Sequence, residues 1–325
     1  MPRLYRLISE HLFFLWTLLS YVLLFFIYNE KSYIITVLLY GIVLFLYFKR
    51  PPLETLFFML LFVLPFQRGI RGWNISVVTA GPEPWMSAYA FYFGFSLKLI
   101  FSFAILLLLF LSPIKTPLTK KGEGFLWILA SFFGWALLSV VVTGGSTVSW
   151  LGLISLIIPL SAFFSGRVLF VKGETRFHAL EVFIAGLAFL GLIGAKQLLS
   201  QRPIGLFLED NAFRNVMGFF TADGAQLYRV SGLFGHPTFF GSYLSLVIPI
   251  ASALTALSFI QKRRNYVAVG LFSLTTILGL LALFGTLSRS AWIATGGAIA
   301  LLVVVNLETF RRFYNKISLA LLIFF

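Results

Sequence analysis

Long apolar runs, separated by short polar connections, occupy almost the whole of this 325-residue chain. An α-helix needs roughly 20 apolar residues to cross the hydrocarbon core of a bilayer. The runs predict helices at 11–28, 32–48, 53–66, 89–111, 124–142, 148–170, 177–199, 237–260, 266–286 and 290–306, and a further run begins near Ile317. The pattern therefore predicts an all-α, polytopic membrane protein with about ten complete transmembrane helices plus a truncated eleventh.

The same pattern divides the chain into three parts. Residues 1–199 predict an N-terminal transmembrane bundle of about seven helices, and residues 237–325 predict a transmembrane segment that carries the motifs described below. Between them, residues 200–236 are the most polar stretch and predict a periplasmic or re-entrant loop. The last run, from Ile317 to Phe325, is too short to cross a bilayer, so we expect the chain to be cut within a membrane helix.

The composition favours lipid over water as the surroundings of the chain. Only 11% of the residues are charged and 59% are hydrophobic, whereas a soluble domain carries about 25% charged residues. The net charge of +14 is compatible with nucleic-acid binding, but the bases lie in short patches between apolar runs and not on one soluble face. The absence of cysteine excludes disulfides and thiolate chemistry. We expect membrane lipids, and no nucleic acid, as partners.

The distribution of Lys and Arg predicts the topology. With a cytoplasmic N-terminus, each connection on the cytoplasmic side carries at least two bases, namely Arg3 and Arg6; Lys49 and Arg50; Lys115, Lys120 and Lys121; Lys172 and Arg176; Lys262, Arg263 and Arg264; Arg311, Arg312 and Lys316. The opposite side shares Lys31, Arg68, Arg71, Arg202, Arg214, Arg229 and Arg289. Because cytoplasmic loops are enriched in Lys and Arg, the sequence predicts a multi-pass membrane protein with its N-terminus in the cytoplasm.

The familiar signatures of soluble enzymes are missing. The sequence has no phosphate-binding GxxxxGK[ST], no Gly-rich dinucleotide fingerprint and no HExxH. The three histidines, His11, His178 and His236, lie far apart along the chain and predict no metal site. A protein site for a divalent ion needs clustered acids, and Glu209-Asp210 is the only adjacent acidic pair. We therefore expect a metal-independent mechanism without a cofactor.

Two arginines on the predicted outer side are candidate ligands for an anion. Arg229 opens the string RVSGLFGHPTFFGSYLSLVIPI, and Arg289 lies in TLSRSAW. Arginine binds phosphate oxygens bidentately and stays protonated, so the two could hold a diphosphate and stabilise it as a leaving group. An isolated arginine at a helix end is more often an interfacial anchor, and we prefer that interpretation for Arg202 and Arg68. Glycines around Arg229 indicate broken or re-entrant backbone, so for Arg229 and Arg289 both interpretations stay open.

The other titratable groups have simpler explanations. His236 could act as a general base, but Pro237 follows it, and this pattern favours helix capping or interfacial packing. Snorkelling of a charged head toward water explains the groups near helix ends, which are Lys98, Arg167, Lys196 and the pair His178 and Glu181.

The two arginine motifs resemble those of the O-antigen ligase and O-antigen polymerase superfamily of bacterial membrane glycosyltransferases. The matching pieces are Arg229-x-x-Gly232, Gly235-His236-Pro237-Thr238, Val247-Ile248-Pro249, Thr286-Leu287-Ser288-Arg289 and Ala291-Trp292. Their order, their separation by one KRR turn and their position after about seven predicted helices match as well. The earlier helices match only in number and character, and the family often has Asn where this chain has Thr238.

The resemblance implies a protein of the bacterial inner (cytoplasmic) membrane with a C-type membrane glycosyltransferase fold. Such an enzyme would take a glycan from undecaprenyl diphosphate and transfer it, without metal, on the periplasmic side. The acceptor would be the lipid A–core in lipopolysaccharide biosynthesis, a second lipid-linked glycan in polysaccharide biosynthesis, or a protein hydroxyl, and the sequence leaves these open. Arg229 and Arg289 would bind the diphosphate, with Arg214 as a third ligand. The family's proposed catalytic His would lie beyond residue 325, so we expect these residues alone to be inactive in transfer unless His236 serves as the base.

A transporter or flippase for lipid-linked sugars is the alternative, because it would share the helix count and the basic surfaces. Coupled transporters normally carry acids or broken helices near the membrane midplane. Glu181 is the only acid well inside a predicted helix, which argues against proton coupling. A structural scaffold is a third interpretation, and the polar stretch 200–236 counts against it.

Overall fold

The structure is a computed structural model, which describes residues 12–25, 30–66, 74–77, 91–94, 97–111, 120–142, 144, 147–171, 173–205, 218–220, 226–234, 236–260 and 266–305. The predicted eleventh helix and the acidic pair Glu209-Asp210 lie outside these residues.

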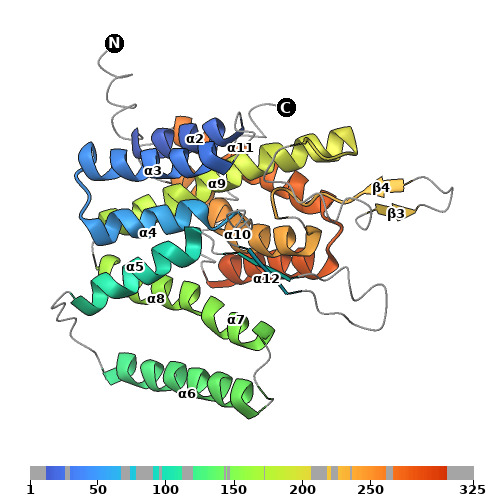
Figure 1. Cartoon of the computed structure of the whole chain (residues 1–325). Coiled ribbons are helices and arrows are strands. Elements are labelled where there is room, and N and C mark those ends of the chain that lie inside the picture. Colours follow the sequence, from blue (N-terminus) through green and yellow to red (C-terminus); the bar gives the residue numbers. More distant parts are fainter. Residues whose placement is uncertain are drawn as a thin grey trace, which may run out of the picture. The chain divides into compact units, whose positions relative to one another are not determined.

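Helices dominate the described residues. In chain order they are α2 Leu12–Phe25, α3 Glu30–Leu46, α4 Pro52–Val63, α5 Leu97–Leu111, α6 Lys120–Val142, α7 Thr147–Ser155, α8 Ile157–Leu169, α9 Gly173–Ser200, α10 Pro237–Ile260, α11 Tyr266–Gly285 and α12 Arg289–Val305 (Figure 1). Each apolar run predicted to end by residue 306 contains a helix, as expected where no water is present to bond the backbone and a helix bonds its own.

One predicted helix is broken in the structure. The run 148–170 predicts a single helix, but α7 ends at Ser155 and α8 begins at Ile157. Pro159 explains the break, because it has no N–H to offer the carbonyl of Ser155 and its ring clashes with that carbonyl. Pro249, by contrast, lies inside α10 without ending it. A proline in an apolar run therefore does not by itself locate the end of a helix.

Two short antiparallel hairpins add strands that the all-α prediction lacks. β1 (Asn74–Val77) pairs with β2 (Phe91–Gly94), and β3 (Gly218–Phe220) pairs with β4 (Gln226–Tyr228). The first hairpin corrects the predicted helix 89–111, because the part of that range before α5 contains strand β2. Three of the four residues of β2 are Phe or Tyr, which fit a strand better than most residues do.

Three helical segments are long and apolar enough to cross a membrane, namely Gly152–Leu169, Gly173–Ser200 and Pro237–Phe259. Seven further helices contribute apolar stretches of 10–17 residues, which are shorter than the roughly 20 that a span needs. Large apolar side chains are exposed on the helices, among them Phe110 (87%) and Leu199 (83%). Exposed apolar surface on this scale is unusual for a soluble monomer. The structure thus supports a membrane protein, and by length and composition three of its helical segments could span, whereas the sequence predicts about ten spans.

The chain divides into two compact units. Unit 1 contains Met1–Thr36, Pro65–Gln67 and Phe177–Phe325, and unit 2 contains Val37–Leu64 and Arg68–Arg176. The three-part division predicted from the sequence follows the polarity of the connections and stays a prediction. Each unit is described by itself below.

In unit 1, helix α10 packs against both α11 and α12, and small residues let the backbones come close. A Cβ on Gly194 of α9 would lie 2.5 Å from the Cβ of Ala282 in α11. A Cβ on Gly241 of α10 would lie 2.9 Å from the Cβ of Ala291 in α12. These close approaches gather the ends of α9 and α11 and the starts of α10 and α12, where the candidate site lies.

In unit 2, helix α4 packs against α5 and α8, and α5 packs against α8. Aromatic pairs fill its interior: Tyr40 stacks on Phe62 with ring centroids 4.4 Å apart, and Phe57 meets Phe170 edge-on at 5.6 Å.

Candidate functional site

The segment that carries Arg229 links β4 to α10 and is anchored on the end of α11. The N–H of Val230 donates to the carbonyl oxygen of Gly285 at 2.8 Å. The Val230 side chain is fully buried, and a Cβ on Gly285 would lie 2.5 Å from Val230 Cγ2. Glycine at position 285 therefore permits the close approach of this segment to α11.

Gln197 of α9 holds the same segment, and Gln201, just after the end of α9, holds the last residue of β4. Gln197 accepts the N–H of Gly232 with Oε1 at 2.9 Å and donates from Nε2 to the Gly232 carbonyl oxygen at 3.1 Å. Gly232 has φ +57°, and a Cβ there would lie 2.9 Å from the ring of Phe240, so this position requires glycine. Gln201 Oε1 accepts the N–H of Tyr228 at 3.1 Å. The backbone is thus fixed on both sides of Arg229.

These anchors bring Arg229 to the turn between α11 and α12. Its Nε donates to the carbonyl oxygen of Thr286 at 3.0 Å, and Arg289, the first residue of α12, follows three residues later. Arg229 is partly buried, whereas Arg289 is exposed. Arg229 therefore contacts the turn that Arg289 directly follows, although the two residues lie far apart along the chain.

Side chains of the turn itself fix its conformation. Leu287 has φ +50°, a left-handed conformation that is uncommon for residues other than glycine. Thr286 Oγ1 accepts the N–H of Ser288 at 3.2 Å and donates to the carbonyl oxygen of Leu283 at 2.7 Å. Trp292 Nε1 donates to that same carbonyl at 3.0 Å. The turn leads into the first N–H groups of α12, which have no partner within the helix.

This arrangement suits an anion such as a diphosphate. Guanidinium groups and the N-terminus of a helix both attract negative charge. Burial lowers the pKa of Arg229, yet an arginine stays protonated in proteins. The bond from its Nε to Thr286 orients the guanidinium plane, and a pre-organised planar fork loses less entropy on binding phosphate oxygens. The same bond also satisfies a carbonyl at the end of α11, which is a structural role for Arg229.

His236 caps the start of α10. Its Nδ1 accepts the N–H of Thr238 at 3.2 Å, and its carbonyl oxygen accepts the N–H of Phe240 at 3.1 Å. Capping is the role that the neighbouring Pro237 favours in the sequence. Burial lowers the pKa of His236, and the positive charge of Arg229 lowers it further. The neutral ring, which can accept this hydrogen bond, is therefore favoured.

Protonation of His236 should weaken the cap, because an imidazolium has no acceptor for the N–H of Thr238. The pKa lies below its ordinary value of 6.5 in the folded protein, so the unfolded chain binds more protons between the two values and stability falls as the pH drops below about 6.5. We expect His236→Ala to lose about 1 kcal/mol of stability at neutral pH and His236→Asn to keep the cap without the pH dependence. Thermal unfolding of the variants between about pH 7.5 and about pH 5 measures both effects. An identical pH dependence in wild type and His236→Asn would contradict the prediction.

Two expectations about ligands are not tested by the structure. Arg214, the third predicted diphosphate ligand, lies outside the described residues. Within the described ranges, no group of three or more His, Asp or Glu side chains is placed to hold a metal ion, and the metal-independent mechanism stays a prediction.

None of the family models, curated proteins or solved structures compared with the chain matches it. The resemblance to O-antigen ligases and polymerases therefore rests on the residues of the two motifs.

Gln197, like Gln201, is a residue of this site that could not be identified from the sequence. The signal in the sequence is small: one amide side chain near the end of the apolar run that forms α9. Its partner is a backbone group in a different segment, which no spacing reveals.

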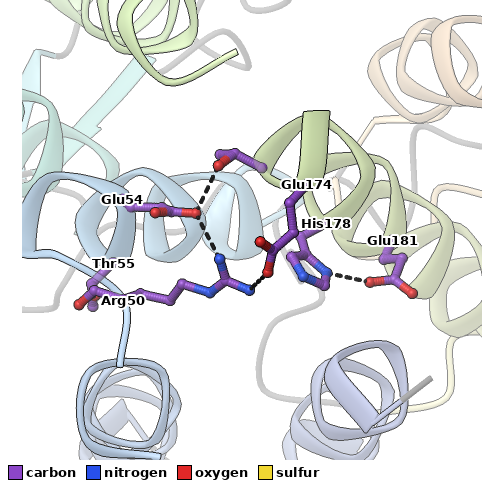
Figure 2. Close-up of polar contacts among 7 residues, drawn as sticks. Arg50, Glu54, Thr55, Glu174, His178 and Glu181 are labelled. Atoms are coloured by element: carbon purple, nitrogen blue, oxygen red, sulfur yellow. Dashed lines mark hydrogen bonds and ion pairs between the residues drawn. The ribbon is translucent and has the colours of Figure 1, made fainter. Parts of the chain in front are cut away.

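Unit 2 contains a partly buried ion-pair cluster that joins the starts of α4 and α9 (Figure 2). Arg50 Nη1 lies 3.2 Å from Glu54 Oε1, and Arg50 Nη2 lies 2.7 Å from Glu174 Oε1. Thr175 Oγ1 donates to Glu54 Oε1 at 2.9 Å. The side chains of Arg50 and Glu54 are only 13% and 3% exposed. In the sequence Arg50 is only one base of an inner connection, and its acidic partners are not predicted.

Unit 1 contains a second, partly buried pair, on helix α9. His178 Nδ1 lies 2.7 Å from Glu181 Oε2, and the Glu181 side chain is 3% exposed (Figure 2). The ring of Phe13 packs on His178 with centroids 4.2 Å apart. The snorkelling explanation is wrong for Glu181, because a snorkelling side chain carries its charge to water and this carboxylate is buried.

Proposed function

We propose that this chain is a bacterial inner-membrane glycosyltransferase of the O-antigen ligase or polymerase type, which binds undecaprenyl diphosphate through Arg229 and Arg289. The lipid would carry a glycan that is passed, without metal, to the lipid A–core or to a second lipid-linked glycan on the periplasmic side. Arg214 would be a third ligand. We propose a C-type fold with about ten complete spans, of which the three long helical segments are the part that length and composition support.

One observation carries the proposal: the hydrogen bond from Arg229 Nε to the carbonyl oxygen of Thr286. It brings a partly buried, oriented guanidinium to the turn from which α12 begins at Arg289. Transfer of the glycan leaves negative charge on the lipid diphosphate, and pre-organised cations stabilise charge that develops in the transition state. A diphosphate leaving group accounts for two cations better than two independent interfacial anchors do.

Contacts within each unit agree with the proposed alternation of membrane sides. In unit 2, the Arg50–Glu174 ion pair joins two connections that are both proposed to be cytoplasmic. In unit 1, the Arg229–Thr286 bond joins two connections that are both proposed to be periplasmic. A span miscounted between either pair would place its connections on opposite sides. The bias of Lys and Arg then favours a periplasmic site and a cytoplasmic N-terminus.

A specific observation favours the transporter alternative. Glu54 and Glu181 are both buried, at 2% and 3% exposure, and buried ionisable groups in membrane helices often belong to proton or substrate pathways. The sequence argument against proton coupling, which considered only Glu181, is weaker for this reason.

Reconstitution of the full-length protein into liposomes with a labelled lipid-linked glycan distinguishes the two functions. A transferase separates the glycan from the lipid diphosphate when an acceptor is added, and it does so in the presence of a metal chelator. A transporter moves the intact donor to the other leaflet. Appearance of labelled acceptor is the expected result; movement of intact donor without cleavage would contradict the proposal and support the alternative.

A further inference from the structure

Gln197 satisfies both backbone groups of one residue with one side chain. Its amide accepts the N–H of Gly232 at 2.9 Å and donates to the carbonyl oxygen of Gly232 at 3.1 Å. A neighbouring β-strand offers a residue the same combination of one acceptor and one donor. Gln197 is 0% exposed, so water does not compete for these bonds. The contact is therefore a specific match between an amide side chain and a non-helical backbone.

The surroundings explain why such a match is needed. Residues 229–234 belong to no helix or strand, and Val230, Ser231 and Leu233 within them are buried. Non-helical backbone at membrane depth is tolerated only where protein satisfies its polar groups. A buried amide is itself costly unless both its atoms are bonded. The two bonds between Gln197 and Gly232 satisfy the polar groups of the backbone and of the buried amide at the same time.

We infer that Gln197 is a positioning residue for the lipid-diphosphate site. It holds the left-handed turn at Gly232 and so fixes the direction in which Arg229, three residues earlier, presents its guanidinium. Gln197 does not itself touch the phosphate. The inference rests on the proposed function, because it concerns how well Arg229 binds that anion.

The substitution Gln197→Glu tests this role through its pH dependence. A protonated carboxyl group has one donor and one acceptor, so it can replace the amide at Gly232. An ionised carboxylate has only acceptors and would repel the Gly232 carbonyl oxygen. Burial raises the pKa of a carboxyl group, whereas the nearby charge of Arg229 opposes this rise. A merely structural role would not make binding depend on the protonation of residue 197.

The measurement is the affinity of the purified protein in lipid nanodiscs for undecaprenyl diphosphate from about pH 8 to about pH 5, with wild type in parallel to account for titration of His236 and of the phosphate. We expect Gln197→Glu to bind about tenfold more weakly than wild type at high pH, and to approach wild type at low pH. Gln197→Leu should bind the lipid about tenfold more weakly than wild type at every pH.

Thr295→Val is the matched control. Thr295 is a buried polar residue of α12 whose hydroxyl donates to the Ala291 carbonyl in its own helix. The affinity of Thr295→Val for undecaprenyl diphosphate should equal that of wild type. The control separates the loss of a buried side-chain hydrogen bond from the loss of the contact with Gly232.

Three outcomes would overturn the inference. The first is that Gln197→Glu binds the lipid as tightly as wild type at all pH values. The second is that its loss of affinity does not recover at low pH. The third applies if Gln197→Glu fails to fold at high pH: it is that Gln197→Leu binds the lipid as tightly as wild type. The proposed function fails separately, and the inference with it, if the wild-type protein does not bind the lipid or if Arg229→Lys binds it equally well.

Discussion

Arg229→Lys should lower the affinity for undecaprenyl diphosphate by about 10- to 100-fold, since a hydrogen bond to a charged group contributes about 1.5–3 kcal/mol. Lysine offers one ammonium group where arginine offers a planar fork. Arg229 uses Nε to bond Thr286, and its Nη groups extend the same plane. A lysine ammonium cannot reproduce this geometry toward both Thr286 and the phosphate. Titration of the purified variants with the lipid in nanodiscs measures the loss.

Two further arginine variants make this result interpretable. Arg289→Lys should also weaken binding, by less than Arg229→Lys, because Arg289 is exposed and its charge is screened by solvent. Arg202→Lys is the control, because Arg202 is exposed just after the end of α9. The affinity of this variant for the lipid should match that of wild type. Equal affinities for wild type and all three variants, with each protein correctly folded, would leave Arg229 and Arg289 as interfacial anchors.

Arg50→Met should destabilise the protein by about 3–5 kcal/mol, the usual cost of removing one partner of a buried ion pair. The variant leaves Glu54, with 3% of its side chain exposed, beside the Thr175 hydroxyl and without its cation. The methionine side chain keeps much of the volume of Arg50, so the loss reports charge and not a cavity. Unfolding of the purified protein by denaturant in detergent measures the change.

A double-mutant cycle and an exposed partner sharpen this test. Arg50→Met combined with Glu54→Leu should be more stable than Arg50→Met alone, because no unpaired charge then remains buried. Glu174→Gln should cost less than about 1 kcal/mol, since the Glu174 side chain is 68% exposed and such pairs contribute little. Equal losses for Arg50→Met and Glu174→Gln would show that the cluster behaves as a surface ion pair.

The helices could be predicted from the sequence because hydrocarbon imposes one rule on every apolar run: its backbone must bond within itself. The break between α7 and α8 could not, because Pro159 and Pro249 look alike in sequence and only the first ends a helix. The hairpins β1–β2 and β3–β4 were missed as well. Their strands are three or four residues long, which is too short for a reliable alternating pattern.

The charged residues of the candidate site could be predicted from the sequence, but the contacts that hold them in place could not. Arg229 and Arg289 stand out because cations at a helix end need an explanation, and Pro237 points to the cap formed by His236. The bonds from Gln197 to Gly232 span 35 residues of sequence, and the ion pair of Arg50 with Glu174 spans 124. Contacts of this kind depend on how helices pack, and no local pattern records them.

The most direct test of the central claim is whether the turn between α11 and α12 retains a lipid diphosphate. Native mass spectrometry of the purified protein with undecaprenyl diphosphate, and with the monophosphate for comparison, measures this without requiring transfer. The account predicts that wild type retains the diphosphate in preference to the monophosphate, and that Arg229→Lys/Arg289→Lys loses both the binding and the preference. Equal retention of the two lipids by wild type, or undiminished retention of the diphosphate by the double variant, would contradict it.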